Sequence, residues 1–278
     1  GPREAEPMNA PEISVVLPCF NELPNLPELR RRLVSVLEAT GRSFEIVFVD
    51  DGSRDGSFEA TAAYAAEDPR LRVLRLSRNF GHQMALTAGV DRARGRLVAV
   101  MDADLQDPPE LLPQMLAKYA EGYEVVYAQR TAREGESAFK RATAHLFYRL
   151  MRRWTNVDIP VDTGDFRLLG PRAVAAFRSL RERHRFIRGM TAWVGFRQAA
   201  VPYVRPARQR GETKYPLRKM VRFALDALTS FSHVPLQIGT WLGFAVSLFA
   251  FLYIVVVVVL KVLGINERGW TTLMGWIL

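Results

Sequence analysis

Two aspartates one residue apart are the residues of this chain best suited to binding a metal ion. Asp102 and Asp104 follow the apolar run of residues 97–101. Side chains at positions i and i+2 of an extended segment point the same way, so both carboxylates could bind one hard cation, Mg²⁺ or Mn²⁺. A cation held in this way would neutralise a diphosphate leaving group. Asp-x-Asp also occurs in ordinary turns, so the assignment needs support from elsewhere in the chain.

Other acidic side chains follow other apolar runs. The run 13–17 leads to Glu22, and the run 44–49 leads to Asp51. Segments with helical periodicity or a strand-like composition continue the alternation at about 26–36, 57 onward, 71–76 and 82–93. Strands alternating with helices predict an α/β fold with a mainly parallel sheet, which binds ligands beyond the carboxyl ends of its strands. We therefore expect these carboxylates to meet at one edge of the sheet, with Asn21 capping the first helix.

Two common nucleotide-binding motifs are absent from the sequence. The first predicted strand is not followed by Gly-x-Gly-x-x-Gly, and Gly-x-x-x-x-Gly-Lys-Ser/Thr occurs nowhere. Neither a dinucleotide site nor a P-loop is therefore supported, and a nucleoside diphosphate would be bound by another route.

The order of several motifs resembles glycosyltransferase family 2. The matching segments are residues 14–22, 49–53, 78–82 and 102–109. Residues 163–168, 186–189, 193–195 and 229–232 are similar to the bacterial polyprenyl-phosphate (bactoprenol) glycosyltransferases, which are relatives of dolichol-phosphate mannose synthase. The resemblance implies a GT-A fold, a divalent metal, and inverting transfer of a sugar from a nucleotide sugar to a lipid phosphate.

The resemblance also implies roles for individual residues. The nucleotide sugar would be bound by Pro18, Phe20, Glu22, Asp51, Asp102 and Arg130. The metal ligands would be Asp102, Asp104 and Gln106, and the catalytic residues Asp104 and Asp165. The acceptor phosphate would be clamped by Arg130, Arg208 and Lys214, since guanidinium groups bind phosphate in a bidentate way. Asp165 is expected to act either as a base or as a positioning group, because a lipid phosphate is already anionic at neutral pH and needs no strong base.

The distribution of charge favours a membrane over a nucleic acid as the partner of this chain. The net charge is +9 and the pI about 10.0, but basic residues concentrate between 205 and 222. Residues 234–260 then carry no charge, and this uncharged segment is long enough for a membrane-spanning helix. Basic residues before the span place the preceding domain on the cytoplasmic side of the cytoplasmic membrane. The segments 139–154 and 217–231 have the pattern of amphipathic helices lying at that interface.

These observations predict a linear domain organisation. Residues 1–10 are expected to be a tag remnant and disordered N-terminus, 11–204 the GT-A domain, 205–233 a basic loop and juxtamembrane helix, and 234–263 a transmembrane helix. Residues 270–278 are expected to begin a second, truncated transmembrane helix, which would make the full-length protein multi-pass. Cys19 is the single cysteine, which argues against a disulfide framework. Homo-oligomerisation is compatible with the resemblance, but the sequence does not count subunits.

Several alternative functions share parts of this pattern. A processive polysaccharide synthase would carry Gln-x-x-Arg-Trp, but the residue three before Arg153 is Leu150. A nucleotide-sugar hydrolase would not need a membrane span, and a non-catalytic scaffold would not need the carboxylates. Within the transferase interpretation, UDP-glucose is the favoured donor. GDP-mannose and a UDP-sugar of the aminoarabinose type remain alternatives.

Overall fold

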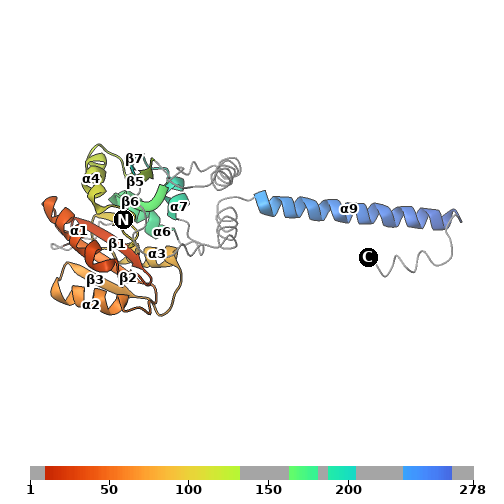
Figure 1. The fold of residues 1–278 in the computed structure, drawn as a ribbon. Helices are drawn as coiled ribbons and strands as arrows, with labels where there is room; N and C mark the ends of the chain where they lie inside the picture. Colours follow the sequence, from red (N-terminus) through yellow and green to blue (C-terminus); the bar gives the residue numbers. More distant parts are fainter. Residues whose placement is uncertain (1–9, 132–162, 181–186, 205–233, 265–278) are drawn as a thin grey trace. The chain divides into compact units, whose positions relative to one another are not determined.

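The computed structural model describes residues 10–131, 163–180, 187–204 and 234–264 (Figure 1). The chain divides into two units, Gly1–Ala227 and Leu228–Leu278. The predicted interfacial segments 139–154 and 217–231, the basic cluster with Arg208 and Lys214, and the apolar segment 270–278 lie outside the described residues.

A seven-stranded sheet forms the centre of the first unit, with the strand order β3-β2-β1-β4-β6-β5-β7. The strands are β1 (Ile13–Cys19), β2 (Phe44–Asp50), β3 (Leu71–Arg75), β4 (Leu97–Val100), β5 (Val125–Arg130), β6 (Thr163–Leu169) and β7 (Gln198–Tyr203). All neighbouring pairs are parallel except those of β6, which runs antiparallel to both β4 and β5. The predicted α/β fold with a mainly parallel sheet is confirmed.

The reversed direction of β6 determines which residues reach the functional edge. Its first residues lie at the edge where the other strands have their carboxyl ends. Arg167 pairs with Val100, the last residue of β4. Asp165, two residues before Arg167, and Asp102, two residues after Val100, both lie at this edge, where their ligand atoms are within 4.8 Å of each other. Two carboxylates far apart in the sequence are thereby placed side by side.

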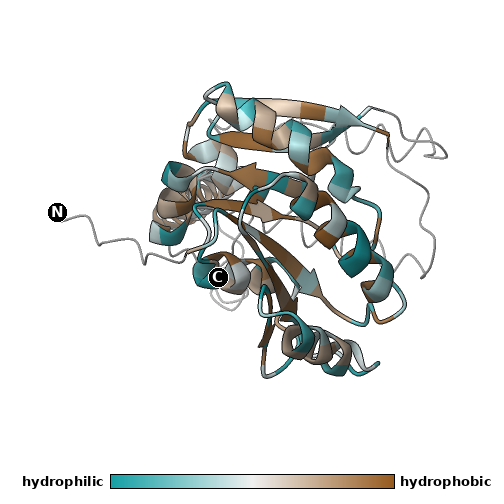
Figure 2. Ribbon diagram, turned by 90° about the vertical axis from the view of Figure 1, so that its left-hand side faces the viewer, coloured by the Kyte–Doolittle hydropathy of each residue, from teal (hydrophilic) through white to brown (hydrophobic). Residues whose placement is uncertain are grey.

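Helices cover both faces of the sheet, as the alternation of elements predicts. They are α1 (Leu26–Ala39), α2 (Ser57–Glu67), α3 (His82–Arg92), the 3₁₀ turn η1 (Pro109–Leu111), α4 (Leu112–Ala120), α6 (Pro171–Ser179) and α7 (Ile187–Trp193). The strands are largely apolar, and the helices turn polar residues outward (Figure 2). β1 and β2 are buried along their whole length, which is typical of parallel strands covered on both faces. One face packs against α1 and α4, while α3 lies over β1 and β2 on the other.

The described part of the second unit, residues 234–264, forms the long helix α9 (Val234–Val262). Within it, Leu236–Val262 is long and apolar enough to cross a membrane, and none of this segment is buried by the rest of the protein. Its large apolar side chains, among them Trp241 and Phe249, are exposed. By length and composition α9 matches the predicted transmembrane segment.

The packing of α3 on the sheet predicts a steric effect at Gly89. A Cβ atom there would lie 2.2 Å from Val16 Cγ1 and 2.9 Å from Val49 Cγ2. We expect Gly89→Ala to destabilise the protein by about 1–3 kcal/mol because overpacking outweighs the higher helix propensity of Ala, worth about 1 kcal/mol. Chemical unfolding in detergent would measure the change in the free energy of unfolding.

Gly41→Asn is a suitable control, since Gly41 has φ +66° with no atom within 4 Å of its would-be Cβ, and Asn tolerates that conformation. A Gly89→Ala protein as stable as wild type would contradict the packing argument.

Candidate functional site

The loops after β1 and β2 form one side of the site and are hydrogen-bonded to each other. Asn21, which has a φ of 56°, donates its backbone N–H to Ser53 Oγ at 3.0 Å and accepts from the Arg54 N–H at 2.9 Å through its side chain. The prediction that Asn21 caps the first helix is therefore wrong. Asn25 occupies the N-cap position without a side-chain cap, and its amide donates to the Glu22 carboxylate at 2.6 Å.

Two of the residues predicted to bind the nucleotide sugar differ in exposure. Phe20, directly after β1, is 42% exposed. Pro18 lies inside the buried strand β1, where it pairs with Val49 of β2. Their contact with a nucleotide stays a prediction.

Asp51 is buried and fixes the loop that precedes α3. Its two carboxylate oxygens accept the backbone N–H groups of Phe80 at 2.7 Å and Gly81 at 2.9 Å. Burial raises the pKa of this carboxyl, and the two N–H groups oppose that effect. The absence of a side chain at Gly52 allows the loops to touch, because a Cβ there would lie 2.8 Å from the backbone of Arg78 and Asn79. Asp51 thus helps to place His82, the first residue of α3.

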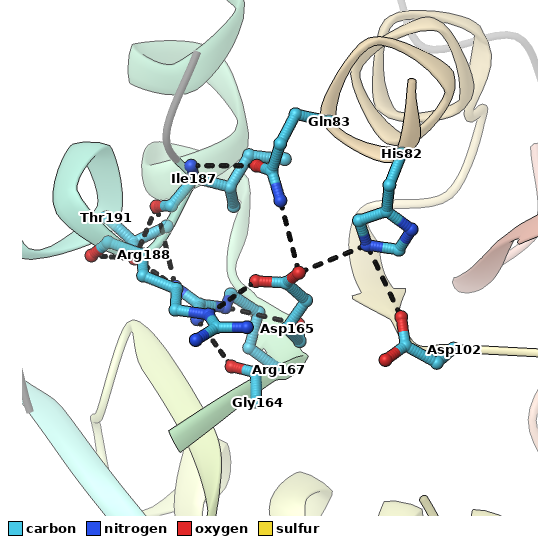
Figure 3. Close-up of polar contacts among 9 residues, drawn as sticks. All are labelled: His82, Gln83, Asp102, Gly164, Asp165, Arg167, Ile187, Arg188 and Thr191. Atoms are coloured by element: carbon cyan, nitrogen blue, oxygen red, sulfur yellow. Dashed lines mark hydrogen bonds and ion pairs between the residues drawn. The ribbon is translucent and has the colours of Figure 1, made fainter. Parts of the chain in front are cut away.

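Asp165 is the centre of the hydrogen-bond network at the carboxyl end of the sheet (Figure 3). Its carboxylate is buried; Oδ1 accepts from Arg188 Nε at 2.8 Å, and Oδ2 lies 3.1 Å from both Gln83 Nε2 and His82 Nε2. Burial alone would raise the pKa of Asp165, but Arg188 and His82 outweigh it and hold the pKa well below its usual range. Asp165 is therefore an ionised carboxylate with donors on both oxygens.

A second layer of contacts holds this network in place. Arg167 lies buried beneath Asp165, where it donates to Gly164 O at 3.0 Å and hydrogen-bonds the Thr191 hydroxyl of α7. Gln83 accepts the Ile187 N–H at 3.1 Å while its amide donates to Asp165. The start of α3, the start of α7 and the first half of β6 are therefore joined into one unit.

His82 connects Asp165 to the aspartate pair singled out in the sequence. Its Nε2 lies 3.3 Å from Asp102 Oδ1 and 3.1 Å from Asp165 Oδ2 (Figure 3). Burial disfavours the charged imidazole, yet the carboxylates of Asp102 and Asp165 outweigh it and raise the pKa of His82 to about 9. His82 is thus a cation at neutral pH.

Asp102 differs from Asp165 in how its charge is compensated. Its contact with His82 is an ion pair rather than a hydrogen bond, and Asp102 Oδ1 is a buried oxygen with no hydrogen-bond donor among the described residues. Burial raises the pKa of the Asp102 carboxyl to about 7, although His82 acts in the opposite direction. A buried carboxylate oxygen without a donor fits a divalent cation, which prefers such ligands.

The prediction that Asp102 and Asp104 point the same way assumes an extended segment. This assumption is wrong. β4 ends at Val100, and the following residues form a bend in which Leu105 has a φ of 61°. Asp104 Oδ1 accepts the Gln106 backbone N–H at 3.1 Å. Within the described part of the chain, the group whose ligand atoms lie within 4.8 Å of one another is His82, Asp102 and Asp165. The metal-binding roles of Asp104 and Gln106 stay predictions.

Arg130 lies at the end of β5, close to the start of β6. Its Nε donates to Tyr203 Oη at 3.3 Å, and Tyr203 donates to the buried carboxylate of Asp107 at 2.7 Å. A Cβ on Gly164 would lie 2.9 Å from Arg130 Nη2, so the missing side chain leaves room for the guanidinium. The structure thus brings Arg130 to the residue next to Asp165.

Sequence reasoning did not assign functions to several residues of the network, namely His82, Gln83, Asp107, Arg188 and Tyr203. His82 and Arg188 lie inside motifs that were recognised, residues 78–82 and 186–189. The sequence gives one indication of the role of His82, which is its position at a predicted helix start, next to a sheet edge rich in carboxylates.

The sequence of this chain is similar to those of known glycosyltransferases. Residues 14–176 match the model of glycosyl transferase family 2. An uncharacterised glycosyltransferase of Bacillus subtilis is 47% identical over 94% of this chain and 81% of its own length. A bactoprenol glucosyl transferase of Shigella phage SfV is 37% identical over 96% of this chain and 87% of its own length. An Escherichia coli prophage bactoprenol glucosyl transferase homologue is 38% identical over 87% and 79%.

Solved structures share the fold at low sequence identity. Glucosyl-3-phosphoglycerate synthase from Mycobacterium tuberculosis, solved with Mn²⁺, UDP-glucose and phosphoglyceric acid, has a TM-score of 0.54 at 18% identity, with 79% of each chain covered. Staphylococcus aureus TarS 1-349 in complex with UDP-GlcNAc has a TM-score of 0.52 at 17% identity, covering 78% of this chain and 65% of that one. The expected GT-A type of α/β fold is confirmed.

The compensated charge of Asp165 predicts an acid-dependent contribution to stability. A carboxylate whose pKa is lowered in the folded state adds stability above its unfolded pKa of about 4, and this stability is lost as the pH falls through the folded pKa. Relative to Asp165→Asn, wild type should be more stable by about 3 kcal/mol near pH 5, and this advantage should shrink toward pH 3. Denaturant unfolding of both proteins across that window measures the difference. An advantage that stays constant would show that the charge of Asp165 is not what its partners stabilise.

Proposed function

The chain belongs to glycosyltransferase family 2, and from that premise we propose that it transfers a sugar from a nucleotide sugar to a polyprenyl phosphate at a membrane. The observation that carries the proposal is the junction of Asp102 and Asp165 through His82 at the carboxyl end of the sheet. This junction provides one carboxylate suited to a cation and another suited to orienting a substrate. Relatives named bactoprenol glucosyl transferases, aligned over most of both chains, support polyprenyl phosphate as the acceptor.

We propose UDP-glucose as the donor and undecaprenyl phosphate as the acceptor. The glucosyl transferases among the relatives support glucose. GDP-mannose and an aminoarabinose-type UDP-sugar remain the alternative donors. The nucleotide would lie over the loops after β1 and β2, where Phe20 is exposed, where the Glu22 carboxylate accepts from the side chain of Asn25, and where Asp51 holds the backbone of the loop before α3.

The diphosphate of the donor would lie at the bend after β4. Asp102, with Asp104 and Gln106, would hold Mg²⁺ or Mn²⁺ there. A divalent cation, when bound, supplies the positive charge that neutralises the diphosphate leaving group. The buried oxygen of Asp102, which lacks a donor among the described residues, is the observation that supports its role as a ligand.

Asp165 is proposed to position the sugar rather than to act as a base. Its low pKa makes it a weak proton acceptor, and donors already contact both of its oxygens. The acceptor phosphate is anionic and attacks the anomeric carbon from the face opposite the leaving group, which inverts the configuration. Holding the reacting atoms in line can account for a large part of the rate enhancement.

The acceptor phosphate would be held by arginine and lysine side chains. Arg130 is available beside Gly164, next to Asp165, and Tyr203 orients its guanidinium. Arg208 and Lys214 are proposed to complete the clamp from the basic segment. Helix α9 would anchor the enzyme in the cytoplasmic membrane with the catalytic domain on the cytoplasmic side, where the lipid phosphate is accessible.

A donor panel tests the proposed reaction. The purified full chain in detergent would be given undecaprenyl phosphate with UDP-glucose, UDP-galactose, UDP-GlcNAc or GDP-mannose. We expect glucosyl transfer from UDP-glucose to be fastest, measured as lipid-linked product. Faster transfer from GDP-mannose would identify GDP-mannose as the donor in place of UDP-glucose and would leave the proposed class of reaction unchanged. Donor hydrolysis without any lipid product would overturn the proposal.

Removal of the charge of Asp102 should disable the transfer. Asp102→Asn keeps the size of the side chain but removes the carboxylate, so we expect turnover to fall at least about 10²-fold, or roughly 3 kcal/mol of transition-state stabilisation. A chelator should abolish wild-type activity, and Mn²⁺ or Mg²⁺ should restore it. Asp68→Asn is the matched control, because Asp68 pairs with Arg70 in the loop between α2 and β3. Full activity in EDTA would rule out the metal role.

A further inference from the structure

His82 occupies the space between two carboxylates that a cation would also favour. Its Nε2 faces Asp102 Oδ1 at 3.3 Å and Asp165 Oδ2 at 3.1 Å. Both partners are acceptors, so Nε2 must carry a proton and cannot simultaneously coordinate a metal ion. The imidazole therefore takes the place of an external cation rather than serving as a ligand for one.

The two contacts of His82 differ in quality. The contact with Asp165 is a hydrogen bond, and Gln83 reinforces it by donating to the same oxygen at 3.1 Å. The contact with Asp102 is an ion pair without hydrogen-bond geometry. The Asp102 contact is thus the one that an incoming cation can replace, while the Asp165 contact can persist.

We propose that His82 is a positioning residue that neutralises Asp102 in the metal-free enzyme and thereby sets its affinity for the divalent cation. The inference rests on the proposed metal role of Asp102 but goes beyond it, because it assigns a competitor for that carboxylate. Metal binding would release Asp102 from His82 and leave His82 on Asp165. The position of the sugar-orienting carboxylate would then be maintained through metal binding.

The position of His82 at the beginning of α3 supports this role. Asp51 fixes the preceding loop through the N–H groups of Phe80 and Gly81, so the imidazole is supported by the loop backbone. α3 is further held by Gln83, which accepts from Ile187 N at 3.1 Å. Release of Asp102 therefore requires no movement of α3 and only the loss of one ion pair.

Mn²⁺ binding to the full chain in detergent, without nucleotide or lipid, tests the inference. Removal of a competing ion pair worth about 1 kcal/mol corresponds to about fivefold tighter binding. We therefore expect His82→Ala to bind Mn²⁺ about fivefold more tightly than wild type in a titration followed by electron paramagnetic resonance. General structural damage would weaken binding instead. His82→Gln keeps a neutral N–H donor, is the safer variant for folding, and should also bind Mn²⁺ more tightly than wild type.

Two controls separate the possible causes. Asp68→Asn removes a carboxylate that pairs with Arg70 in the loop between α2 and β3, away from the site, and should leave Mn²⁺ affinity near that of wild type. Asp102→Asn should lose Mn²⁺ binding; if it binds as wild type does, the proposed metal role of Asp102 is wrong. If Asp102→Asn loses binding but neither His82 variant binds more tightly, the metal role stands and the inference about His82 is overturned. Equal tightening by Asp68→Asn would also overturn it, and so would the absence of Mn²⁺ binding in wild type and both His82 variants.

Discussion

The buried, ionised carboxylate of Asp165 constrains the arrangement of this enzyme more than any other group. Removing a carboxylate from water costs several kcal/mol unless donors compensate for the lost hydration. The compensation here comes from Arg188 on α7 and from His82 and Gln83 on α3. Two helices and one strand must therefore meet at one point, and the buried Arg167 stabilises the junction from below. The same contacts that stabilise the charge also orient it, so that stability and the geometry of the site have a common origin.

The reversed strand β6 makes this junction possible. In a fully parallel sheet, residues at the start of a strand lie at the edge opposite the ligand site. Because β6 runs antiparallel to β4 and β5, its first residues lie at the functional edge instead. Gly164 thus lies beside Arg130 at the end of β5, and Asp165 lies close to Asp102 in the segment after β4. One change of strand direction brings Asp102, Asp165 and Arg130 together, the three residues for which we propose roles toward the donor, the sugar and the acceptor phosphate.

Local sequence patterns encode some parts of this architecture, and these parts can be predicted from the sequence. The parts that depend on long-range packing cannot. The buried runs at 13–17 and 44–49 indicated parallel strands because a strand covered on both faces must be apolar throughout. The direction of β6 has no local signature, so the pairing of Asp102 with Asp165 could not be derived from spacing. The prediction that Asn21 caps a helix is wrong. Its side chain instead accepts a hydrogen bond from the backbone N–H of Arg54, which lies far along the chain. The extended alignment of Asp102 and Asp104 failed because the chain bends after Val100.

The environments of the two main carboxylates push their pKa values in opposite directions. Asp165 has arginine, imidazole and amide donors, and its pKa lies well below the usual range. Among the described residues, the imidazole of His82 is the one cationic partner recorded for Asp102, and burial raises the pKa of Asp102 to about 7. Pairs of acidic groups with separated pKa values commonly divide the tasks of a site between them. The carboxylate with compensated charge is suited to holding a neutral sugar in a fixed orientation. The one with incomplete compensation retains a demand for positive charge, and a divalent cation arriving with an anionic diphosphate can meet that demand. The asymmetry in hydrogen bonding is therefore the physical basis for the proposed division of roles, in which Asp102 faces the leaving group and Asp165 faces the sugar.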